Sequence, residues 1–320
     1  MLWSLHSKSW ASFSMLFNRT ASLVIGKEGG TGKELTGLRF SFSIQKGATK
    51  SPNKCTVKVW NAAPDTRKLI EVIGNVMILK AGYSEDIGAV TIFAGDVIRS
   101  LTVREGPDWI TEIEMQDGFM EFRDAKVSIS LAKGATTLQA IKAISAKFGL
   151  PVRPLPVGVA AKQYAAGFAF VGRVRDAMDK ACNHMGLEWS IQNREIQIIK
   201  KGGVLKQKAF VLSPDTGLVG SPAQESKTMT EKAAAKEGVT ANQPGVRKTT
   251  ERDKDGEVQE MLQVLGYKVK SLLQPTVEPG GYVQIKSAGI AGEFFRVEEL
   301  THVGDTHGNE WHTDMTLRFV

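Results

Sequence analysis

Apolar and polar residues alternate along most of the stretch 16–120. The run LRFSFSI at residues 38–44 is the clearest example. Because successive side chains of a strand point to opposite faces of a sheet, this spacing predicts strands with one buried face. Further strands are expected at 56–60, 76–83, 90–98 and 109–115, with a short helix at 66–73. Turns rich in glycine and aspartate separate these strands, which predicts an antiparallel sandwich or barrel.

The period changes after about residue 126. Apolar residues recur at helical spacing from 138 to 148, Thr136 can cap this helix, and Gly149 can end it. A second helix is expected at 174–185, followed by a two-stranded hairpin within 187–200. Two helices against a hairpin make a small α+β unit.

Strand patterning returns at 205–221 and 259–320. The segment 223–257 between them holds seven basic and seven acidic residues, no aromatic residue, and neither leucine nor isoleucine. Burial of so little apolar surface does not offset the conformational entropy lost on ordering. The segment is therefore expected to be a mobile loop or an extended arm.

The predicted fold class is therefore mainly β with a small α+β middle domain. The expected parts are an N-terminal extension at 1–14, a first β-barrel domain at 15–125, a middle domain at 126–204, and a second β-barrel domain at 205–320 with a mobile insertion at 223–257. The two β domains are of similar size, which suggests an ancient duplication.

Composition excludes several classes of protein. Lysine and arginine number 41 against 34 acidic residues, a net charge of +7 without a basic tail or arginine stripe, so nucleic-acid binding has little support. Cys55 and Cys182 lack a second cysteine at metal or redox spacing, which indicates a reduced, disulfide-free chain. Polar residues interrupt the first 14 residues, so no export signal is expected there, and no run of 18 apolar residues predicts membrane insertion.

A glycine-rich stretch, IGKEGGTGKE at 25–34, raises the possibility of a phosphate-binding loop. Such a loop needs a glycine five positions before Gly-Lys and a hydroxyl residue after it. Aligned on Gly32 and Lys33, those positions hold Lys27 and Glu34, and an alternating strand follows in place of a helix. The stretch is therefore predicted to be a turn that connects two strands.

Three other groups of reactive residues are better explained by structural roles. The histidines in THVGDTHGNEWH are predicted to face solvent on a hairpin, because zinc needs three or four ligands that this spacing does not assemble. Cys182 and His184 lie on a predicted helix without a triad partner, and Cys182 is expected at the edge of its packed face. Glu112 and Glu114 share one face of a strand, a common arrangement of exposed acids. No catalytic, cofactor-binding or metal-binding residue is predicted.

A series of short motifs recurs in a definite order along the chain. They lie at 76–83, 92–97, 109–118, 137–150, 172–191, 212–222, 272–280 and in the terminal hairpin. In this order the chain resembles the baseplate hub proteins of contractile-tailed bacteriophages, which include late control protein D and the T4-type hub, and it is similar to the base of type VI secretion spikes. The likeness covers about residues 16–320, and its specificity comes from the shared order of motifs.

This resemblance implies two tail-tube-like antiparallel β-barrels or sandwiches in one chain, and mechanical work without enzymatic activity or cofactors. It implies a homotrimer whose six barrels form a pseudo-hexameric ring between the tail tube and the central spike. The partners implied are the tail tube protein, the central spike protein, the tape measure protein and baseplate wedge proteins, with genomic DNA only passing through the lumen. The implied location is the virion tail baseplate, after assembly in the host cytoplasm.

Other hypotheses remain open at this point. The chain could be the tail-tip ring of a noncontractile phage or the base of a secretion spike. A cell-wall hydrolase or wall-binding module is a weaker alternative, because no glutamate-led catalytic helix is present, and nucleotide hydrolysis is weaker still. The segment 223–257 could become ordered against a neighbouring subunit or the wedge ring.

Overall fold

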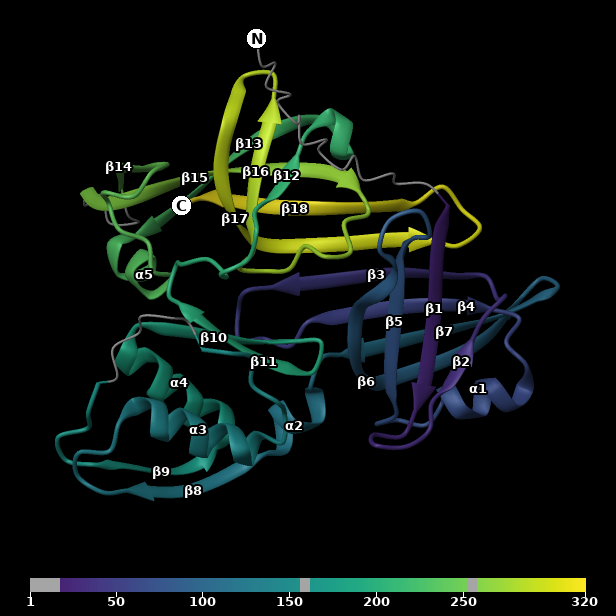
Figure 1. The fold of residues 1–320 in the computed structure, drawn as a ribbon, viewed down its shortest axis with the longest axis horizontal. Helices are drawn as coiled ribbons and strands as arrows, with labels where there is room; N and C mark the ends of the chain where they lie inside the picture. The colour runs from purple at the N-terminus through teal and green to yellow at the C-terminus, as the bar shows by residue number, and fades with distance from the viewer. Residues whose placement is uncertain (1–17, 156–161, 253–257) are drawn as a thin grey trace, which may run out of the picture.

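The computed structural model describes residues 18–155, 162–252 and 258–320, and the expected extension at 1–14 lies outside these ranges. Figure 1 shows two β-rich halves joined through neighbouring strands, and a smaller unit that holds α3 and α4. Strands dominate, which confirms the predicted mainly β class with a small α+β unit. None of the described helices is long and apolar enough to cross a membrane.

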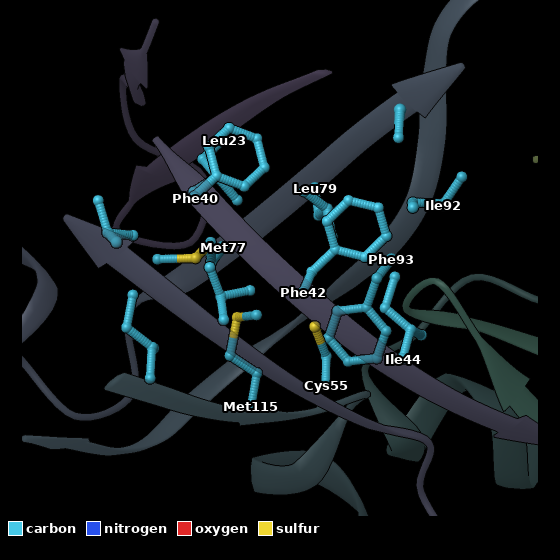
Figure 2. Packing of buried hydrophobic residues seen from close by; sticks show 14 of the residues in the cluster. Leu23, Phe40, Phe42, Ile44, Cys55, Met77, Leu79, Ile92, Phe93 and Met115 are labelled. Carbon is cyan, nitrogen blue, oxygen red and sulfur yellow. The ribbon is translucent and has the colours of Figure 1, made fainter. Parts of the chain in front are cut away.

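The first half closes around one apolar core. Its elements are β1 (Arg19–Gly26), β2 (Lys33–Leu35), β3 (Phe40–Gly47), β4 (Lys54–Trp60), α1 (Pro64–Ile70), β5 (Val76–Tyr83), β6 (Gly88–Glu105) and β7 (Asp108–Gln116). Strand β6 pairs with β5 along 88–96 and with β7 along 96–105, so it bends from one layer into the other. Figure 2 shows Phe42, Leu79 and Phe93 among the side chains that fill the space between the layers.

The middle unit follows the predicted pattern and adds to it. It contains α2 (Phe119–Asp124), β8 (Lys126–Leu131), α3 (Thr137–Phe148), β9 (Phe168–Arg173), α4 (Val174–Met185), β10 (Leu187–Gln192) and β11 (Glu195–Lys200). The Thr136 hydroxyl accepts a hydrogen bond from the Gln139 amide at 3.2 Å, and the Gln139 side chain accepts one from the Thr136 amide at 2.8 Å. This capping box confirms the predicted start of α3. The β8·β9 sheet was not predicted.

The second half surrounds another apolar core. Its elements are β12 (Phe210–Leu212), a 3₁₀ turn (Pro214–Thr216), β13 (Leu218–Thr230), α5 (Glu231–Lys236), β14 (Val246–Arg252), β15 (Val258–Leu272), β16 (Tyr282–Ser287), β17 (Ile290–Asp305) and β18 (Trp311–Phe319). Phe295, Val297 and Leu317 are almost fully buried in this core.

The segment 223–257 corrects a prediction. Its described residues form the end of β13, α5 and β14, and both strands pair with β15. Met229, Ala234 and Val239 pack with Leu262 and Val264 of β15 in a small separate core. The sequence predicts a mobile loop or an extended arm here and assigns no strand or helix, because that prediction counts only the apolar residues within the segment. The missing apolar surface comes from β15, which is a neighbour in space. We call 223–252 with the first part of β15 the arm.

The two halves repeat one strand arrangement. In the first half β5, β6 and β7 pair in sequence, and in the second half β16, β17 and β18 do the same. The β6·β7 register shifts between Val97 and Arg99, and the β17·β18 register shifts between Val297 and Glu299. A second shift follows Leu79 in β5 and Ile285 in β16. Because both irregularities recur at matching places, residues 90–105 of β6 are equivalent to 290–305 of β17. Asp96 then matches Arg296, and Trp109 on β7 matches Trp311 on β18.

The halves join through strands β3 and β17, which pair antiparallel with Ser43 opposite Val303. This joint gives one continuous series of strands in the order β13-β15-β18-β17-β3-β4-β7-β6, with four strands from each half. One face of the series packs on the two cores. The other face carries exposed and half-buried side chains across both halves, and we call it the bare face.

Candidate functional site

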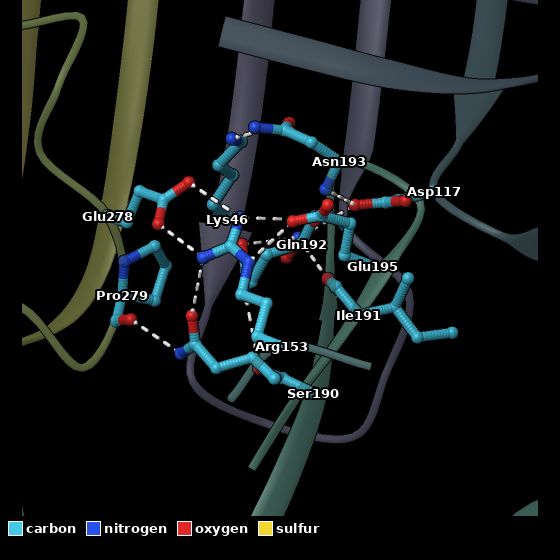
Figure 3. Close-up of polar contacts among 12 residues, drawn as sticks. Lys46, Asp117, Arg153, Ser190, Ile191, Gln192, Asn193, Glu195, Glu278 and Pro279 are labelled. Carbon is cyan, nitrogen blue, oxygen red and sulfur yellow. Dashed lines mark hydrogen bonds and ion pairs between the residues drawn. The ribbon is translucent and has the colours of Figure 1, made fainter. Parts of the chain in front are cut away.

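The three units meet at a buried polar junction, shown in Figure 3. Asp117 follows β7 and is fully buried. Its carboxylate accepts hydrogen bonds from the backbone amides of Asn193 at 2.6 Å and Arg194 at 2.7 Å. Both residues have positive φ, 55° and 63°, so this turn between β10 and β11 directs two consecutive amides at one carboxylate. Burial raises the pKa of Asp117 to about 6, against the opposing effect of the amides and of Lys46.

Arg153 ties the middle unit to the second half at the same junction. Its Nη1 donates to Glu278 at 2.6 Å, and its Nε donates to Glu195 at 2.8 Å. Burial alone would raise the pKa of Glu278, but the hydrogen bond and charge of Arg153 hold it below the usual value. The amine of Lys46 on β3 donates to Asn193 at 2.9 Å, and burial lowers the pKa of Lys46. Every charge in this junction has an internal partner, so its role is to hold the units together.

Two equivalent positions of the halves carry opposite charges toward the middle unit. Asp96 in β6 pairs with Arg194, and Arg296 in β17 pairs with Glu188 of β10 at 2.5 Å. Asp96 and Arg296 are each only 2% exposed. If the β10–β11 hairpin were reversed, Arg194 would approach Arg296 and Glu188 would approach Asp96. Buried like charges cost free energy, so the hairpin fits between the halves in one orientation.

The bare face has a different character. Several of its charges form pairs across neighbouring strands: Lys58 with Glu112 at 3.2 Å, Arg99 with Glu114 at 2.6 Å, and Lys268 with Glu225 at 2.7 Å. Small polar side chains such as Ser41, Ser43 and Thr301 lie between them. The face is therefore mostly polar and carries charges of both signs, with exposed Leu101 and Val103 near the β6 edge.

The series of strands ends in two edges without a partner among the described residues. At one end, residues 98–105 of β6 pair with β7 on one side only. At the other end, β13 pairs only with β15. Unpaired backbone groups of this kind can hydrogen-bond another strand, so these edges and the bare face form the candidate site.

The glycine-rich stretch lies where the sequence predicts. It is the turn between β1 and β2, which pair antiparallel. Glu28 of this turn forms an ion pair with Arg194 at 2.5 Å, and the Lys33 amine donates to the Thr66 hydroxyl at 2.9 Å. The prediction of a strand-connecting turn is confirmed.

The histidine prediction is wrong for His302. This side chain is 1% exposed on the core side of β17, with Nδ1 2.9 Å from the Thr313 hydroxyl. His307 lies exposed in the turn, as predicted, and His312 lies on β18 between Glu310 and Asp314. Within the described ranges, no group of three or more ligand residues could hold a metal ion. The alternation of the strand could have predicted this burial, because His302 lies two residues after the apolar Leu300 and so shares its face.

His302 gives a testable pH dependence. Burial, with a smaller effect of Lys46, lowers its pKa to about 3 from 6.5. The folded chain therefore binds fewer protons there than the unfolded chain, so stability falls as the pH drops from 6.5 toward 3, by up to about 1.4 kcal/mol per unit. We expect His302→Gln to reduce this slope in urea unfolding at pH 7, 5.5 and 4.5. His307→Gln should leave it unchanged, and equal slopes in all three proteins would contradict the assignment.

The remaining candidate residues have structural roles. Cys182 is buried in the core of the middle unit, and burial raises its pKa to about 12. His184 stacks on Tyr164 and contacts the Thr137 hydroxyl at 2.9 Å. Glu112 and Glu114 share the bare face, as predicted, and each has a basic partner.

Comparisons with known proteins agree with this architecture. No protein-family model and no curated protein matches the chain. Among solved structures, a tail protein from Neisseria meningitidis matches with a TM-score of 0.59 and 11% identity, over 94% of this chain and 97% of the other. The 43 kDa tail protein of prophage MuSo2 from Shewanella oneidensis matches at 0.58 and 9%, over 94% and 98%. An E. coli type VI secretion component, described as similar to the T4 tail proteins gp27 and gp5, matches at 0.54 and 9%, over 92% and 76%. The chain thus has the fold of phage tail proteins and of a type VI secretion component, the fold expected for the hub and spike-base family that its sequence resembles.

Proposed function

We propose that the chain is a structural hub of a contractile phage tail, which assembles as a trimer between the tail tube and the central spike. The observation that carries the proposal is the repeat of one strand arrangement in both halves, joined by β3 and β17. One chain supplies two equivalent blocks, so three chains supply six. Such a ring can match sixfold symmetry on one side and threefold symmetry on the other.

The bare face is proposed to line the lumen of this ring. Strands β1, β5 and β16 lie on the other side of the two cores, and a closed ring has more room for them outside the inner sheet. Because acidic and basic residues are interspersed on the bare face, and several form ion pairs, its attraction for DNA phosphates is weak. Tape measure protein and DNA would pass along it, and the chain would act without enzymatic activity, at the baseplate of the virion.

A second candidate is the base of a secretion spike. The match to the E. coli secretion component favours it, and a complex of Francisella PdpA and VgrG matches with a TM-score of 0.55 and 7% identity, although this chain covers only 59% of that one. Both candidates use the same ring. Neighbouring genes for sheath, wedge and tail tube proteins would separate them.

The ring is tested by native mass spectrometry of the chain alone and with its spike protein. We expect a species of about three times the 34.8 kDa chain mass, alone or with the spike protein bound. Negative-stain images should show a ring with a central lumen. A strict monomer under both conditions would contradict the proposed function.

A further inference from the structure

The joint between β3 and β17 shows how two blocks of this chain fit together. Ser43 lies opposite Val303, and the pairing continues from Glu299 to Asp305 of β17. Gly304 leaves room for the ring of Phe42, since a Cβ there would lie 2.3 Å from it. Trp311, opposite Gly304, packs edge-on against Phe42 with ring centroids 5.6 Å apart. It belongs to the core of the first half although it comes from the second, so the joint is sealed by apolar packing as well as by backbone pairing.

The same two kinds of edge are left free at the ends of the strand series. Residues 99–105 of β6 are equivalent to 299–305 of β17, which pair with β3. Strand β15 is equivalent to β4, because β15 pairs with β18 in the register in which β4 pairs with β7. Strand β13 is then equivalent to β3, because β13 pairs with β15 as β3 pairs with β4. We propose that the free edge of β6 pairs antiparallel with β13 of a second copy of this chain. This inference rests on the proposed function and adds the joint between its copies.

The internal joint fixes the register of this pairing. Val103 is equivalent to Val303. Ala223 is equivalent to Ser43, because Ala223 lies opposite Lys268 of β15, Ser43 lies opposite Thr56 of β4, and these two partners occupy equivalent positions. Val103 of one copy therefore lies opposite Ala223 of the next, Leu101 opposite Glu225, and Arg99 opposite Lys227. Arg99 and Lys227 already have acidic partners in Glu114 and Glu237, which balance the two like charges.

Exposure of equivalent residues shows what the second copy covers. Trp311 is 3% exposed at the internal joint, whereas its equivalent Trp109 is 41% exposed at the free edge. On the bare face of the same edge, Leu101 and Val103 are 49% and 38% exposed. Aromatic side chains that leave water on association contribute strongly to interfaces. The internal joint is thus the template for a surface that now lacks its cover.

Disulfide trapping of the full chain tests the register. Val103→Cys with Ala223→Cys in one chain should give covalent dimers and trimers on non-reducing gels, with the ladder ending at the trimer. Ser43→Cys with Val303→Cys, the equivalent internal pair, should give only an intrachain bond. Val103→Cys with Lys227→Cys, on the same face but four residues away, should give no ladder. Cys55 and Cys182 are buried, so they do not compete.

Native mass spectrometry of the unsubstituted chain separates the two ways of failing. A trimer without a 103–223 cross-link, or with an equally efficient 103–227 cross-link, would overturn this joint and leave the ring intact. A monomer with and without the spike protein, and no ladder, would overturn the ring and the joint together. A ladder that runs past the trimer would support the pairing but contradict closure at three copies.

Discussion

Arg194→Met is expected to lower the free energy of unfolding by about 3–5 kcal/mol, because it leaves buried carboxylates without their partner. Arg194 forms ion pairs with Asp96, which is nearly inaccessible, with Glu121 at 2.6 Å and with Glu28. Methionine keeps much of the side-chain volume but none of the charge. Urea unfolding of the full chain at pH 7, followed by tryptophan fluorescence, measures the loss.

Lys58→Met is the matched control. Lys58 also pairs with a carboxylate, Glu112 at 3.2 Å, but both side chains are largely exposed on the bare face. An exposed pair contributes about 0–1 kcal/mol, so this variant should unfold close to the unsubstituted chain. Adding Asp96→Asn to Arg194→Met should recover part of the loss, since one orphaned charge is removed. Similar losses in the two single variants would show that the junction does not depend on buried charge.

Much of the fold can be predicted from the sequence, because it depends on local signals. Helix α3 begins at its Thr136 cap, α3 and α4 both end at a glycine, and β5 coincides with the predicted strand at 76–83. The turn at 25–34 lies between two paired strands, as its departure from the phosphate-loop pattern at Lys27 and Glu34 indicates. These features need only the period of the apolar residues and a few turn residues.

Features that depend on distant strands could not be predicted in this way. The strands and helix of 223–252 are stabilised by packing on Leu262 and Val264 of β15. The burial of His302 depends on the pairing of β17 with β3. The equivalence of the halves appears only through matching registers and bulges, since equivalent positions such as Asp96 and Arg296 differ in charge. For the same reason the sequence predicts two β domains but does not show which face could line a lumen.

Two equivalent tryptophans provide the last prediction, with opposite expected effects. Trp311→Ala should lower the free energy of unfolding by about 3–5 kcal/mol, because the ring is buried against Phe42 in the first-half core. Trp109→Ala should cost the isolated chain only about 0.5–1 kcal/mol, because the exposed ring mainly stacks with Arg67, whose guanidinium lies 4.5 Å from its centroid. The order reverses for assembly: Trp109→Ala should fold normally yet lose the trimer in native mass spectra. A Trp109→Ala chain that still forms a full trimer would place the joint between copies elsewhere, while a large loss of stability in that chain would mean that its ring is already covered within one copy.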